Sequence, residues 1–176
     1  MSDAVPHLIV AALILPAHLG ALTLLLLRHR LGTSRLVSLG SCLALVGIAA
    51  SLTLHASGGA VESYALGNWR APFGIVLVLD RLSAMMLLLT SVLALAVMSY
   101  AVVTGADRKG WHFHPLFQFQ LLGLNGAFLT GDLFNLFVFF EVLLIASYGL
   151  LLHGQGAARL KAGVQYVVIN LVGSTL

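Results

Sequence analysis

The chain has 176 residues, of which 60% are hydrophobic and only 9% are charged. Soluble domains have roughly 45 to 50% apolar and about 25% charged residues, so this composition excludes an ordinary soluble domain and predicts an all-α integral membrane protein. The formal net charge is +3, but the basic residues fall in short segments between apolar runs, which argues against a nucleic-acid partner.

Six apolar segments predict a polytopic helical bundle of about six transmembrane helices, a single domain over residues 1–176: about 5–27, 36–56, 82–104, 113–130, 133–153 and 163–176. Five of them reach the roughly 17 to 25 residues that a spanning helix needs. The sixth stops short, so we expect a chain truncated at its C-terminus. The first segment should stay as a spanning helix, because Asp3 rather than a basic residue precedes it.

The first two segments carry packing signals. Pro16 removes a backbone donor, which predicts a kink and a free carbonyl near Ala12. His18 follows the kink; it could handle protons, or it could be satisfied by the local backbone. In the second segment a stripe of small residues predicts close packing against another helix: Gly40, Ala44, Gly47 and Ser51.

The basic residues predict an orientation. Of the nine lysine and arginine residues, only Arg70 and Arg81 lie on one side, which leaves seven in the segments 28–35, 105–112 and 154–161. The positive-inside rule therefore places these three loops in the cytoplasm and the N-terminus outside. In the hydrophilic stretch 57–81, the run from Ile75 to Leu79 suits a short extended segment, and Asp80 suits the start of a helix.

Glu141 is the first candidate for a functional residue, because it lies in the middle of an otherwise apolar run. An acid at the centre of a spanning helix costs roughly 2.5 to 3.5 kcal/mol, so it should face protein or water, and such residues mark ion or proton paths. Its alternative role is a buried acid that only packs helices together. Asp132 begins the same segment and suits a capping role, or the rim of a path.

The remaining candidates are weaker. His153 ends the fifth segment, where the helix dipole favours a protonated imidazole and a proton exit is conceivable. His112 and His114 lie two apart without a carboxylate at ligand spacing, and Cys42 is alone, so no metal site is expected. Phosphate-binding loops, dinucleotide fingerprints and a Ser-His-Asp arrangement in a plausible context are not recognised, so no cofactor is expected either.

Three blocks resemble the antiporter-like membrane subunits, and most closely the D-type subunit of the Mrp-type multisubunit Na⁺/H⁺ antiporters. Residues 67–75 read Gly-Asn-Trp-x-Ala-Pro-x-Gly-Ile, and residues 79–83 read Leu-Asp-x-Leu-Ser. Residues 130–141 read Thr-Gly-Asp-Leu-Phe-Asn-x-x-x-Phe-Phe-Glu, with Leu-Asn-Gly-Ala-Phe at 124–128. This last block is the most specific, and the similarity covers almost the whole chain.

The resemblance implies a bundle of roughly fourteen helices with two inverted repeats, of which this chain would be the N-terminal part. It places Glu141 in a proton path, opposite a lysine expected beyond Leu176. The implied partners are other antiporter subunits, membrane lipid, protons and Na⁺ or K⁺, in a multi-pass protein of the bacterial cell (inner) membrane. Two alternatives stay open: a proton-translocating subunit of an NADH:quinone oxidoreductase or related hydrogenase, which would make it part of an enzyme, and a truncated, non-transporting scaffold.

Overall fold

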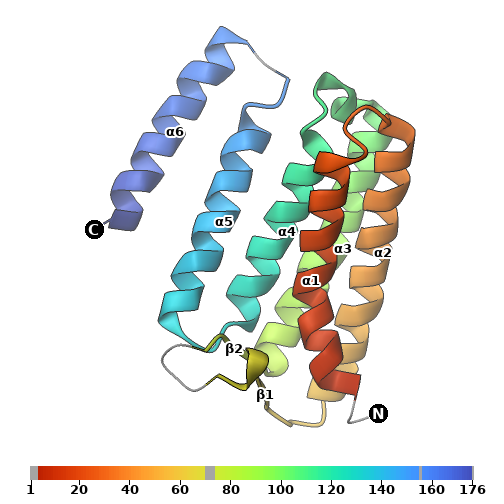
Figure 1. The fold of residues 1–176 in the computed structure, drawn as a ribbon, viewed down its shortest axis with the longest axis vertical. Helices are drawn as coiled ribbons and strands as arrows, with labels where there is room; N and C mark the ends of the chain where they lie inside the picture. Colours follow the sequence, from red (N-terminus) through yellow and green to blue (C-terminus); the bar gives the residue numbers. More distant parts are fainter. Residues whose placement is uncertain (1–3, 70–73, 155, 176) are drawn as a thin grey trace.

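The computed structural model describes residues 4–69, 74–154 and 156–175, so the expectations that involve Asp3 and residues 70–73 fall outside it. The helices lie side by side as an up-and-down bundle with α6 at its edge (Figure 1). Their bounds are α1 Val5–Leu25, α2 Leu31–Ala56, α3 Arg81–Thr104, α4 Phe113–Leu129, α5 Leu133–Leu151 and α6 Ala157–Thr175, with 3-10 turns η2 Leu66–Asn68 and η3 Ala106–Lys109. The expected all-α, multi-helix architecture is confirmed.

Four of the described helices, α1, α2, α3 and α5, are long and apolar enough to cross a membrane. With 17 residues, α4 is shorter. Two helices begin earlier than their apolar runs: α2 begins at Leu31 instead of 36, and α6 at Ala157 instead of 163. The added turns carry Arg35, Arg159 and Lys161. Arg159 and Lys161 are exposed, as expected for long basic side chains that extend from a helix end toward water.

Side-chain caps fix where α3 and α5 begin. Asp80 accepts a hydrogen bond from the Ser83 backbone N–H at 2.7 Å, and the Ser83 hydroxyl accepts one from the Asp80 N–H at 2.8 Å. This capping box satisfies two backbone donors that the first helical turn leaves free, and it confirms Asp80 as a helix-start residue. Gly105 ends α3 in the left-handed conformation, at φ 70°.

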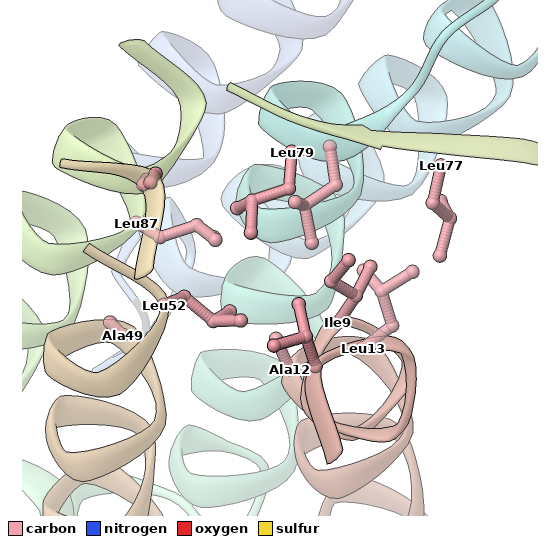
Figure 2. Close-up of a cluster of buried hydrophobic side chains, with 12 residues drawn as sticks. Ile9, Ala12, Leu13, Ala49, Leu52, Leu77, Leu79 and Leu87 are labelled. Atoms are coloured by element: carbon pink, nitrogen blue, oxygen red, sulfur yellow. The ribbon is translucent and has the colours of Figure 1, made fainter. Parts of the chain in front are cut away.

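A small hairpin closes one end of the bundle. Strands β1 Glu62–Ala65 and β2 Val76–Leu79 pair antiparallel, which confirms the extended segment expected there. Gly131, just before α5, donates to the Val76 carbonyl at 2.8 Å, and Leu77 forms a bridge with Thr130. Figure 2 shows Leu77 and Leu79 of this hairpin above a buried apolar cluster to which α1, α2 and α3 contribute.

The three basic connections lie together at the opposite end, at the top of Figure 1. They join α1 to α2, α3 to α4 and α5 to α6, so the clustering of positive charge expected from the sequence is present in the fold. The first helix, α1, begins at the hairpin end.

Close helix packing occurs in a different place from the one expected. Gly40, Ala44, Gly47 and Ser51 of α2 are all exposed, and no described atom lies within 4 Å of a Cβ built at Gly40 or Gly47. The expected contact of this stripe is therefore wrong for the described bundle, because α2 turns its other face, with Cys42 and Leu45, to the core. Small residues instead join α4 to α5, since a Cβ at Gly123 would lie 2.7 Å from the Leu143 nitrogen.

Gly126 gives a direct test of this packing. A Cβ at Gly126 would overlap the ring of Phe139 on α5, so we expect Gly126→Ala to lower the free energy of unfolding by roughly 1 to 3 kcal/mol, the usual cost of overpacking. Thermal unfolding of the purified full-length protein measures the change. Gly47→Ala is the matched control, because it makes the same substitution on an open helix face. Equal stability of the two variants would contradict the packing.

Candidate functional site

The site is built on α5, whose first residue is fixed by Asp132. The Asp132 carboxylate accepts a hydrogen bond from the Asn135 backbone N–H at 2.7 Å and a second from the Asn135 side-chain amide. These bonds favour the charged form and hold the pKa of Asp132 below its usual range. Asp132 thus acts as the cap of α5, which was the simpler of its two expected roles.

Glu141 lies nine residues further along α5, about 13.5 Å deeper at about 1.5 Å per residue. It is half-buried, whereas much of α5 is open: among the described residues of the helix, only Asn135 and Ala146 are buried. No hydrogen bond or ion pair joins the Glu141 carboxylate to another residue of the described ranges. A carboxylate in this position can bind and release a proton without first breaking an internal bond.

Tyr148 lies two turns beyond Glu141 on the same face of α5. Its ring meets Tyr166 of α6 edge-on, with ring centres 5.5 Å apart. Glu141 shares this face with Tyr148, so it lies on the side of α5 that turns toward α6, the helix at the edge of the bundle in Figure 1.

The two histidine candidates lie on other elements than Glu141, His18 on α1 and His153 after the end of α5. His18 is exposed on α1, and its Nδ1 donates to the Ile14 carbonyl at 2.9 Å, so it is satisfied by the local backbone. His153 follows α5, about 18 Å beyond Glu141 along the helix axis. Its Nε2 donates to the Ala106 carbonyl at 2.9 Å, and its buried Nδ1 has no partner among the described residues.

A buried polar cluster at the basic end was missed in the sequence. Arg35 of α2 donates two hydrogen bonds to Asp107 of η3, from Nε at 2.6 Å and from Nη2 at 2.7 Å. His114 of α4 donates from Nε2 to the same carboxylate at 3.2 Å, which leaves Nδ1 to accept from the Ser38 hydroxyl at 3.0 Å. Asp107 and Ser38 are fully buried, so the cluster ties α2, η3 and α4 together.

Sequence spacing did not indicate this cluster, because 76 residues separate Ser38 from His114. Ser38, His114 and Asp107 form a hydrogen-bonded line. The buried Ser38 hydroxyl cannot meet a substrate from solvent, so the line connects helices. His112 precedes α4, whereas His114 lies in its buried face.

The free carbonyl expected from Pro16 is present. Asn125 of α4 donates from Nδ2 to the Ala12 carbonyl at 2.9 Å, which replaces the helical bond that proline cannot make. The partner was not foreseen, since the amide lies 113 residues away. Among the described residues no group of three His, Cys, Asp or Glu side chains could hold a metal ion.

The Asp107 cluster predicts a stability that depends on pH. The Arg35 guanidinium holds the pKa of Asp107 below its usual range, so the pair stabilises the fold above the ordinary aspartate pKa of about 3.9. This stabilisation is lost as the pH falls through the lowered pKa. We expect Asp107→Asn to lower the unfolding temperature at pH 7. On acidification, the unfolding temperature of this variant should fall less than that of the native protein.

Thermal unfolding of the full-length protein between pH 7 and pH 3 measures both effects. Arg108→Gln is the matched control, because Arg108 neighbours Asp107 but is exposed. An Asp107→Asn variant as stable as this control would show that the pair contributes nothing.

Comparison with known proteins places this geometry in context. The chain is 51% identical over 183 residues to a protein of Rhizobium meliloti (strain 1021) that is named as the probable D-type subunit of a K(+)/H(+) antiporter, covering 100% of this chain and 33% of the relative. It is 39% identical over 171 residues to the D-type subunit of an Na(+)/H(+) antiporter of Alkalihalophilus pseudofirmus, covering 97% of this chain and 34% of that one. No protein-family model matches.

A solved structure has a similar fold. A chain in the structure of the Mrp complex from Dietzia sp. DQ12-45-1b superimposes with a TM-score of 0.84 at 34% sequence identity, over 98% of this chain and 32% of that chain. The present chain thus spans about a third of the length of the proteins it matches.

Proposed function

We propose that the protein exchanges a monovalent cation, Na⁺ or K⁺, for protons across a membrane. The proposal rests on the similarity of the whole chain to part of the D-type subunit of cation/proton antiporters. The observation that carries the site is Glu141, a half-buried carboxylate without a hydrogen bond to a described residue, near the middle of an apolar helix. We assign Glu141 the role of a proton-binding group in the transmembrane path.

Glu141 would act as a switch. A cation nearby favours the ionised carboxylate and releases its proton, and withdrawal of that cation favours proton uptake. The two lysines of this chain, Lys109 and Lys161, belong to the basic end of the bundle rather than to the depth of Glu141. The opposing cation is therefore expected in the rest of the protein. Asp132 at the start of α5, His153 at its end and His18 on α1 are lower-ranked groups of the path.

The protein would work with other subunits of an antiporter complex in the bacterial cell membrane, where such exchange supports pH homeostasis. The basic connections would face the cytoplasm and the hairpin the outside. A redox-linked proton pump is the second candidate, because the resemblance extends to such subunits, and neighbouring genes for flavin and iron–sulfur subunits would favour it. A non-transporting scaffold is the third candidate. Cation/proton exchange that is unaltered when this protein is absent would favour it.

Replacement of Glu141 tests the site. In the full complex, in everted vesicles, we expect Glu141→Gln to abolish proton movement driven by Na⁺ or K⁺, because the amide cannot bind a proton at neutral pH. Glu141→Asp should retain part of it, since the carboxylate is kept but shortened. Fluorescence of a pH-sensitive dye measures the exchange after addition of each cation.

Glu62→Gln is the matched control, because Glu62 is the other glutamate of the chain and lies in β1, outside the helices. Its exchange should equal that of the native protein at equal complex assembly. Native exchange in Glu141→Gln would remove Glu141 from the path.

The orientation has its own test. In a Cys42→Ala background, a membrane-impermeant maleimide should label Glu62→Cys on intact cells but Lys109→Cys only in everted vesicles. The two positions lie at opposite ends of the bundle, so one face of the membrane should expose only one of them. The reverse pattern would invert the orientation.

A further inference from the structure

One face of α4 carries a line of polar side chains that the Glu141 path does not use. His114, Gln118 and Asn125 follow one another at spacings of four and seven residues, so they share a face of the helix. Their exposed fractions are 2%, 0% and 1%. In an apolar bundle such buried groups are costly unless each is hydrogen-bonded.

The line has partners on two other helices. Ser38 and Ser41 of α2 bond to His114 and Gln118, the second at 2.9 Å from Ser41 Oγ to Gln118 Oε1. The Ala12 carbonyl of α1 accepts from Asn125. The polar line therefore runs along the interface of α1, α2 and α4 for about 16 Å, the rise of eleven helical residues.

Two atoms of this line lack a partner among the described residues: Gln118 Nε2 and Asn125 Oδ1. One is a donor and the other an acceptor, both are fully buried, and each unmade bond costs roughly 1 to 3 kcal/mol. On α1, Gly20 lies beside Gln118 and Ala12 beside Asn125, with Pro16 between them, and none of these three side chains carries a hydrogen-bonding group.

We propose that the interface of α1, α2 and α4 binds water at Gln118 and Asn125. One water molecule accepts from Gln118 Nε2 and another donates to Asn125 Oδ1, which gives the two buried amides the bonds that they lack within the described residues.

The two ends of this line differ. At the His114 end it meets Asp107 and Arg35, beside a cavity of about 160 Å³ whose lining includes Arg28, Arg108 and Trp111. Beyond Asn125 it meets the apolar cluster of Figure 2, to which Leu129 belongs and in which Leu52 and Leu87 are labelled. The line thus adjoins a cavity at its His114 end and the apolar cluster at its Asn125 end.

The hydrated line is separate from Glu141. Gly123 and Gly126, where α5 approaches α4 most closely, lie on a different side of α4 from Gln118 and Asn125. Water bound there solvates the α1–α4 contact and the kink at Pro16, and it leaves the path at Glu141 unconnected. The experiment therefore tests the line whether or not Glu141 carries protons.

Radiolytic hydroxyl-radical labelling with mass spectrometry tests the proposal on the full-length protein in its complex. X-rays split bound water where it lies, so side chains beside it are oxidised even when a scavenger removes radicals from bulk solvent. Leu121, which is 3% exposed and lies between Gln118 and Asn125 on α4, should be labelled several-fold faster than Leu52 and Leu87. All three are buried leucines of equal intrinsic reactivity.

Asn125→Leu removes one water-binding amide and should reduce the labelling of Leu121 toward that of Leu52. The comparison of leucines in the native protein stands even if this variant does not fold. Equal, slow labelling of Leu121, Leu52 and Leu87 in the native protein would show a dry interface and overturn the proposal.

Discussion

A bilayer core offers no water to polar groups, and this constraint organises the bundle around α4. Two faces of α4 have different roles in the bundle. One face carries His114, Gln118 and Asn125, each bonded to a neighbouring helix or to η3. Another carries Gly123 and Gly126, which let the backbone of α5 approach closely. The position of Glu141 follows from this second contact, because α5 is held to the bundle mainly through α4.

Local rules of the sequence predicted much of this fold. Apolar length predicted the helices, and short-range hydrogen bonding predicted the caps at Asp80 and Asp132. Pairings over long separations could not be predicted in the same way. Arg35 and Asp107 are 72 residues apart, and nothing in either local pattern marks the other as its partner. Charged residues near helix ends were assigned to loops, although Arg35 lies within α2.

The glycine patterns show the same limit. Small residues at helical spacing on α2 predicted a close contact, yet that face is open in the described bundle, while the contact lies at Gly123 and Gly126. Periodicity shows that a face exists but does not select the helix that covers it. Glu141 was identified because a single carboxylate in an apolar run is costly, a property that needs no knowledge of its neighbours.

The hairpin is tied to the start of α5 by the backbone of β2. Gly131 bonds to Val76, and Leu77 pairs with Thr130, directly before the Asp132 cap. The strands and the first turn of α5 therefore form one mechanical unit at the membrane surface. A binder that clamps the strands would therefore also hold the first turn of α5, and with it the depth at which Glu141 lies.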